Sequence, residues 1–166
     1  MQAILSQVIT STNEIFKAEA GSVALLEPSG EQIVIRAAVG AGADKVRGLS
    51  LPVNKGIIGW VVLNEEPALV PDVLRDERWN QNIDKESGFL TRSIMCVPMK
   101  ADGHPIGVIE LMNIRPDFMN DNGLKILMVI ADHAALAIEN ARLLAETRQR
   151  SEEQALLFEA MAIVTS

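Results

Sequence analysis

A chain of 166 residues is long enough for one domain of ordinary size and too short for two. Its formal net charge of −7 argues against nucleic-acid binding, because contacts with phosphate need clustered Lys and Arg. A single Cys excludes a disulfide framework, and the sequence has neither a signal pattern nor an apolar run of about 18 to 20 residues. These features predict a soluble, cytoplasmic protein that does not enter a membrane.

The first half of the chain predicts a helix followed by a hairpin. Apolar residues recur at helical spacing from Ile4 to Phe16, as in an amphipathic helix. Residues 22–27 and 32–39 are rich in β-forming residues and flank Pro28-Ser29-Gly30, which is typical of a hairpin. Residues 41–55 are rich in Gly and other small residues, and we expect a loop with a short strand near residues 49–53.

The middle of the chain predicts short elements. Gly56 and Gly59 open an apolar helix that Pro67 ends, residues 68–70 form a short buried strand, and residues 72–87 read as a polar loop.

A second hairpin and a long helix complete the pattern. Residues 93–99 and 105–113 are joined by residues 100–104, where Asp-Gly supplies the positive φ of a tight turn. Both strands are apolar on both faces and are predicted to be central. From Asp121 a helical pattern runs to Leu144, turns polar, and becomes apolar again from Leu156.

This order of elements predicts an α/β sandwich of the α+β type. A mainly antiparallel sheet of six strands carries the terminal helices on one face, and the middle loops cover the other.

Several motifs resemble the GAF domain, a small-molecule-sensing fold. Gly-x-x-Gly-Trp at residues 56–60 is followed by Pro67, by Asp72 and by Asp-Glu-Arg-Trp at residues 76–79, as in the middle of that family. Residues 88–99 and 105–113 are similar to its second hairpin. The resemblance implies a sensor domain over residues 1–145. Residues 146–166 would then be a signalling helix or coiled coil that leads to an output domain such as a histidine kinase, a cyclase, a phosphodiesterase or a transcription regulator.

The signature of the cyclic-nucleotide-binding members is incomplete. In those members Asn-Lys is followed by Phe and by Asp-Glu, and the Lys and Asp pair. Here Asn113 is followed by Ile114, and Phe118 by Met119-Asn120-Asp121-Asn122. Arg115 is the remaining candidate partner for Asp121.

The resemblance places a ligand between one sheet face and the middle loop. Glu110 lies on an otherwise apolar strand, so it needs a partner, a ligand or water, unless the strand end meets solvent. Arg78 could meet an anionic group and Trp79 cover an apolar one; alternatively, Arg78 pairs with Asp76 or Glu77 and Trp79 anchors the loop. Thr91 and Ser93 are expected to share one strand face. The candidate ligand-binding residues are Val39, Ile57, Asp72, Arg78, Trp79, Phe89, Thr91, Ser93 and Glu110.

Catalytic groups are hard to find in the sequence. His104, His133 and Cys96 have no metal-ligand spacing, and Cys96 sits in an apolar strand where a buried role is expected. The chemistry of GAF-like methionine sulfoxide reductases resembles a thiol relay that uses more than one Cys. A chain with one Cys cannot supply that relay.

The sequence therefore predicts a non-catalytic sensor for an unidentified small molecule, with no cofactor that the sequence can name. It would work as a homodimer through its first and last helices, along the stripe Ala134, Ile138, Ala141 and Leu144. The alternative is a vestigial domain that binds nothing and acts as a dimerisation scaffold, and a thiol-based reductase is a third hypothesis.

Overall fold

The computed structural model describes residues 1–79 and 82–165, and its helices and strands largely follow the predicted order. In chain order the helices and strands are α1 (Gln2–Phe16), β1 (Ala20–Leu26), β2 (Gln32–Gly40), α2 (Ala43–Val46), β3 (Ser50–Pro52), α3 (Gly56–Asn64), β4 (Ala68–Val70), the 3-10 helix η1 (Val73–Arg75), α4 (Asn82–Ser87), β5 (Ile94–Ala101), β6 (His104–Met112), the 3-10 helix η2 (Pro116–Phe118) and α5 (Asp121–Thr165).

One antiparallel sheet of six strands organises the domain, in the order β3-β2-β1-β6-β5-β4. The predicted α+β sandwich is thereby confirmed. The prediction of the central strands is right for β6, which lies in the middle, but its central neighbour is β1. β5 lies one position further out, beside the three-residue edge strand β4, and is still buried on both faces because α5 covers one and α3 the other.

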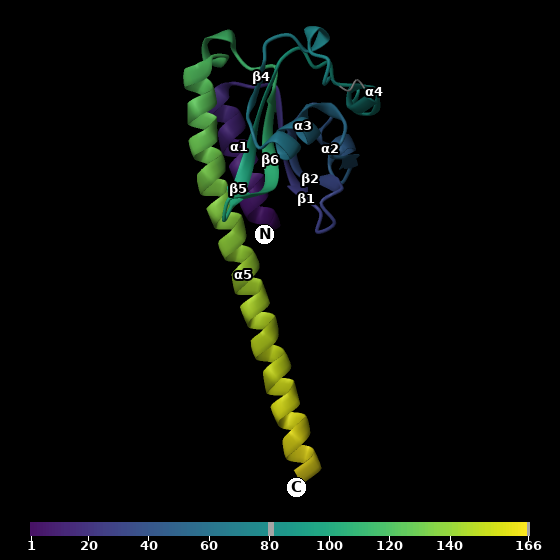
Figure 1. Ribbon diagram of the computed structural model, residues 1–166, viewed down its shortest axis with the longest axis vertical. Coiled ribbons are helices and arrows are strands. Elements are labelled where there is room, and N and C mark those ends of the chain that lie inside the picture. Colours follow the sequence, from purple (N-terminus) through teal and green to yellow (C-terminus); the bar gives the residue numbers. More distant parts are fainter. Residues whose placement is uncertain (80–81, 166) are drawn as a thin grey trace.

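The terminal helices α1 and α5 pack side by side on one sheet face (Figure 1). Leu5, Ile9 and Phe16 of α1 join Leu127 and Ala131 of α5 in a core over that face. On the opposite face, α3 and the segments around it form a second core against the same strands. Successive residues of β6 pack alternately into the two cores, because side chains point to opposite faces along a strand.

Two short helices lie where the sequence predicts only loop. α2 follows Gly42, which has φ of 78°, and its four residues are too few to show a helical period. α4 is six residues long and falls within the predicted polar loop, of which residues 80–81 lie outside the described part. The two helices contact each other although they are far apart in the sequence, and the local pattern does not reveal such contacts.

The second hairpin turns more tightly than expected. The strands extend to Ala101 and His104, and only Asp102 and Gly103 lie between them, both with positive φ. This is the backbone that an Asp-Gly hairpin turn requires.

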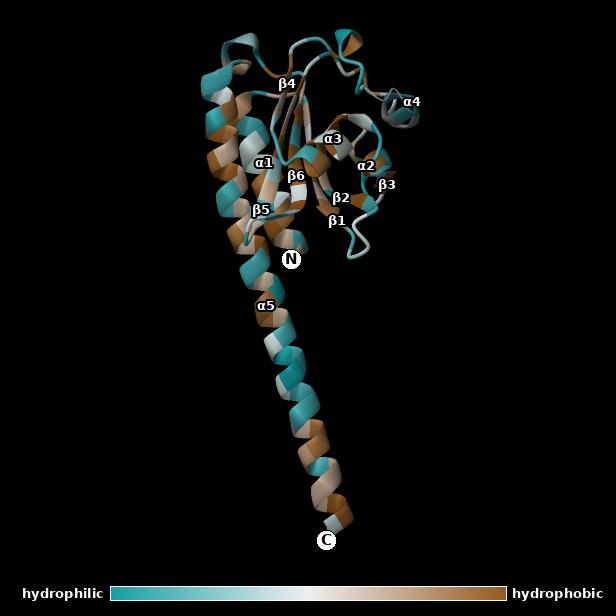
Figure 2. Ribbon diagram, in the orientation of Figure 1, coloured by the Kyte–Doolittle hydropathy of each residue, from teal (hydrophilic) through white to brown (hydrophobic). Residues whose placement is uncertain are grey.

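The last helix, α5, is continuous over 45 residues. The polar stretch at 146–153 does not interrupt it. It runs well beyond the sheet (Figure 1), and every residue from 147 to 165 is exposed. Figure 2 shows this projecting part as largely hydrophilic at first and more hydrophobic towards its end. None of the helices in the described residues is long and apolar enough to cross a membrane.

The Gly-x-x-Gly motif has a steric role. Gly56 begins α3 with φ of 76°, and a Cβ at Gly59 would lie 2.3 Å from the carbonyl oxygen of Val53. The second glycine therefore lets α3 pack closely on the chain that precedes it.

We expect Gly59→Ala to lower the free energy of unfolding by about 2 kcal/mol, because backbone must move to admit the methyl group. Urea unfolding measures this change. Gly103→Asn is the control, since its site has no neighbour within 4 Å and Asn tolerates positive φ. An equal loss in the two variants would contradict the steric role.

Candidate functional site

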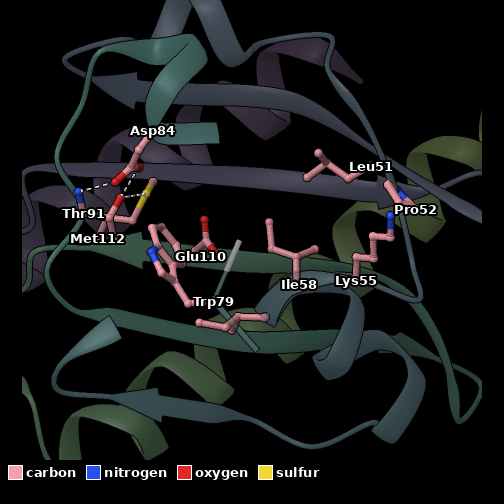
Figure 3. A pocket seen from close by; sticks show the side chains of 11 residues that line it. Leu51, Pro52, Lys55, Ile58, Trp79, Asp84, Thr91, Glu110 and Met112 are labelled. Atoms are coloured by element: carbon pink, nitrogen blue, oxygen red, sulfur yellow. Dashed lines mark hydrogen bonds between the residues drawn. The ribbon is translucent and has the colours of Figure 1, made fainter. Parts of the chain in front are cut away.

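Two small cavities lie next to each other on the sheet face that carries α3. Each has a volume of about 30 Å³, so both are small. The first, shown in Figure 3, is lined by Leu51, Pro52, Lys55, Gly56, Ile57, Ile58, Trp79, Asp84, Thr91, Glu110 and Met112. The second is bounded mainly by apolar and small residues, among them Ile35, Ala38, Val39, Val46 and Phe89. Asp84, Glu110 and Met112 border both cavities, so they form the wall between them.

Glu110 is the buried carboxyl group of this wall. It lies on β6 opposite Ser22 of β1 and Cys96 of β5. Its exposed fraction is 7%, which rules out the alternative that this face of the strand meets solvent. No described residue donates a hydrogen bond to it. Burial, with a smaller contribution from the charge of Asp84, raises the pKa of Glu110 to about 7.

Helix α4 brings Asp84 over the cavities. The Thr91 hydroxyl donates to Asp84 Oδ1 at 2.7 Å, and the Thr91 backbone N–H donates to Asp84 Oδ2 at 2.9 Å (Figure 3). These two bonds fasten α4 to the segment that leads into β5. Sequence reasoning missed Asp84 because one carboxylate in a polar loop carries no local signal. It missed Met112 because that residue resembles any other apolar strand residue.

The predicted site residues divide into two groups. Ile57, Trp79, Thr91 and Glu110 line the first cavity, while Val39 and Phe89 line the second together with Glu110. Asp72, Arg78 and Ser93 line neither cavity.

The three predicted residues that line neither cavity make hydrogen bonds elsewhere in the domain. Asp72 is exposed and caps η1 by accepting a hydrogen bond from the Leu74 N–H. The Ser93 hydroxyl accepts a hydrogen bond from the backbone N–H of Ile114 at 3.3 Å, so Thr91 and Ser93 do not face one cavity together as expected.

Arg78 takes the alternative role that the sequence left open. Its guanidinium donates to both Asp76 oxygens, at 2.9 and 2.6 Å, and lies 4.3 Å from the ring centre of Trp60. Trp79 packs against the second core, as the alternative of a loop anchor predicts, and it also lines the first cavity.

Asn113 connects three parts of the domain. Its Oδ1 accepts from the backbone N–H groups of Arg92 and Ser93, and its Nδ2 donates to Leu90 and to Glu19. These hydrogen bonds give Asn113, which follows β6, a structural role that does not require a bound nucleotide. The suggested pairing of Arg115 with Asp121 is not formed, since Arg115 bonds the nearer Asp117 at 3.0 Å.

The described residues contain no group of three or more His, Cys, Asp or Glu side chains that could hold a metal ion. Cys96 is fully buried, and burial, with a further contribution from Glu110, raises the pKa of its thiol well above the usual value. A thiol in this state is a poor nucleophile at neutral pH.

The family model for the GAF domain matches residues 1–138, and the chain therefore belongs to the GAF domain family. GAF domains are small-molecule sensor domains found in phosphodiesterases and signalling proteins. Among curated proteins, the dual 3′,5′-cyclic-AMP and -GMP phosphodiesterase 11A of Takifugu rubripes is 32% identical over 116 residues, which are 68% of this chain. The match spans only 13% of that phosphodiesterase.

Solved structures share the fold at low sequence identity. The GAF domain of a phosphoenolpyruvate-protein phosphotransferase from Coxiella burnetii has a TM-score of 0.77 at 21% identity, covering 87% of this chain and 86% of the other. The free methionine-R-sulfoxide reductase from Neisseria meningitidis has a TM-score of 0.66 at 20% identity, with coverage of 84% and 80%. One fold thus serves both a regulatory domain and an enzyme, and likeness of fold alone does not choose between them.

The raised pKa of Glu110 makes stability depend on pH. The folded state holds this proton up to about pH 7, whereas the ordinary value is 4.5. The free energy of unfolding should therefore fall by up to about 3 kcal/mol as pH rises from about 4.5 to 7. Glu110→Gln carries no titrating proton, so we expect it to exceed the wild type in stability at about pH 8 and to match it at about pH 4.5.

Urea unfolding at both pH values measures the difference. Glu66→Gln is the control, because Glu66 is exposed. A difference between Glu110→Gln and the wild type that is the same at both pH values would show that the carboxyl titrates normally.

Proposed function

We propose that this domain is a non-catalytic sensor that binds a small molecule against Glu110 and passes the change to an output domain through α5. The observation that carries this proposal is a buried carboxyl group with no described hydrogen-bond partner, at the wall between two cavities. A buried group of this kind is costly for folding alone. A cost of that kind is typical of functional sites.

Binding would act on α4 first. Each cavity is too small for an organic ligand of several heavy atoms, so entry requires Asp84 to move and the two spaces to join. That movement would break the bonds between Asp84 and Thr91. The next residue, Arg92, donates to Asn113 and to Glu19, at the junction between α1 and β1.

The sheet offers a direct route to α5. Met95 of β5 lies against the first turn of α5, where a Cβ on Gly123 would be 3.5 Å from the Met95 methyl group. The same Gly123 approaches the Phe118 carbonyl oxygen of η2 closely. A shift of β5 or of the chain after Asn113 would therefore change the seating of α5.

The exposed face of α5 suits a second copy of this chain. The stripe suggested by the sequence is only half available, because Ala134 and Ile138 are buried in the domain's own core while Leu144 is exposed. A different seam is exposed and repeats every seven residues, with Val129, Leu136, Leu143, Leu157 and Val164 at one heptad position and Arg150 interrupting it. Ile126, His133, Asn140, Thr147, Gln154 and Met161 occupy the companion position.

This pattern favours a weak parallel pair. Leu at the d position and a polar residue such as Asn140 at the a position favour two strands in register, at a cost in stability. α1 exposes one large apolar side chain, Ile15, so the proposed seam is on α5 rather than shared between both terminal helices.

We expect Leu143→Glu to convert a dimer of the wild type into a monomer, because it places a charge in the seam at a residue that is 47% exposed in one chain. Ala145→Glu, two residues away and pointing from the seam, is the matched control and should remain dimeric. Sedimentation equilibrium at tens of micromolar measures the masses. The same mass for both variants would rule the seam out.

Ligand binding is tested by a thermal-shift screen with nucleotides, amino acids and aromatic acids on the wild type and on Thr91→Val combined with Trp79→Ala. We expect at least one compound to raise the melting temperature of the wild type by several degrees and to have little effect on the variant. Compounds that stabilise both proteins equally would place the site elsewhere.

If no compound binds, the alternative of a dimerisation scaffold is favoured. The thiol-based reductase is disfavoured by the burial and raised pKa of Cys96.

A further inference from the structure

The first cavity has an acidic end. The carboxyl of Glu110 points into it between Trp79 and Ile58, and Asp84 lies beyond (Figure 3). Cys96, opposite Glu110 on β5, is a buried thiol and supplies no positive charge. Arg78, on the neighbouring loop, has its guanidinium committed to Asp76. Within the described part of the chain, no cation therefore balances this pair of carboxyl groups by direct contact.

The other end of the same cavity is positive. Lys55 lies there (Figure 3) and makes no ion pair with a described residue. It is also the N-cap of the nine-residue helix α3, whose first turn receives no side-chain cap. The first backbone N–H groups of a helix lack intrahelical partners and carry a partial positive charge. Gly56, Ile57 and Ile58, which supply those groups, line the cavity.

The space between the two ends is apolar. Leu51, Ile58 and Met112 form walls of the first cavity. Beyond Glu110, the second cavity continues with Ile35, Val39 and Phe89. A ligand that fits this arrangement carries a positive group, a negative group and an apolar branch.

We propose, on the basis of the sensor function above, that the ligand is an apolar α-amino acid. Its ammonium group pairs with Glu110 and Asp84, its carboxylate faces Lys55 and the first turn of α3, and its side chain enters the second cavity once the Asp84 side chain leaves Thr91. The ammonium supplies the hydrogen-bond donors that Glu110 lacks. Each polar end of the site then finds a group of opposite charge, and the apolar walls shield the buried Glu110 from water.

A bound cation also changes the protonation of the site. A positive charge beside Glu110 favours its ionised form and lowers its raised pKa, so binding near pH 6 releases a proton into the solvent. A neutral or anionic ligand would not cause this release.

The experiment is isothermal titration calorimetry with L-valine, L-leucine and L-methionine at about pH 6, in two buffers of different ionisation enthalpy. Two matched analogues of leucine separate the ends: isocaproate lacks the amine, and isoamylamine lacks the carboxylate. Cyclic AMP and cyclic GMP are included as anionic ligands with a purine.

We expect at least one of the three amino acids to bind with net proton release, and both leucine analogues to bind at least about tenfold more weakly than leucine. Glu110→Gln should weaken amino-acid binding at least about tenfold and abolish the proton release, and Lys55→Met should weaken binding. The controls Glu66→Gln and Lys125→Met, both at exposed positions, should bind as the wild type does.

The outcomes separate this inference from the sensor function. Binding of a cyclic nucleotide alone, equal binding of leucine and isocaproate or isoamylamine, or unchanged amino-acid binding by Glu110→Gln would overturn the inference while the domain remained a sensor. Absence of binding by every compound, at millimolar concentration, would count against the sensor function as well.

Discussion

The two middle strands of the sheet must be covered by apolar side chains on both faces, and the rest of the architecture follows from this constraint. β1 and β6 are flanked by strands on both sides and have no edge through which polar groups reach solvent. The two ends of the chain supply α1 and α5 for one face, in regular amphipathic helices. The other face is left to the long connection between β2 and β5, which consists of short elements. The helices α1 and α5 pack tightly on their face of the sheet. The short elements on the other face leave the cavities.

Glu110 shows what this difference between the faces permits. Its neighbours along β6, Ile109 and Leu111, face α1 and α5 and are completely buried among apolar side chains. A carboxyl group on that side would have to displace apolar side chains of the closely packed core. On the other side, short helices and loops bring Asp84, Thr91 and the start of α3 close to the strand. A site can therefore form there without disturbing the core that holds the domain together.

The sequence predicted the longer helices and strands well, because the spacing of apolar residues reflects which side of each element is buried. The helix from Gln2, both hairpins and the start of α5 are each encoded by local apolar patterns, and Asp-Gly encodes the second turn. Half of the site was reachable in the same way, since Glu110 is conspicuous on an apolar strand. The other polar residues of the site were not reachable, because Asp84 is brought to the cavities by α4, a helix fastened by bonds to Thr91. The role of Arg78 was also ambiguous in the sequence, because only the local geometry shows that it pairs with Asp76.

In the proposed relay, the projecting part of α5 would act as a lever arm. At about 1.5 Å per residue, the helix beyond Ile138 is about 40 Å long, so a tilt of about 5° at its base would move its tip by about 3.5 Å. Its base is seated on β5 and on the loop that follows Asn113. Gly123 lies about 22 Å from Ile138 along the helix, so a tilt of about 5° about Ile138 would move the base by about 2 Å. A rigid helix that pivots at Ile138 would thus move further at its tip than at its base. In the proposed relay, the ratio of the projecting length of α5 to its seated length would set how far the tip moves for a given movement at the base.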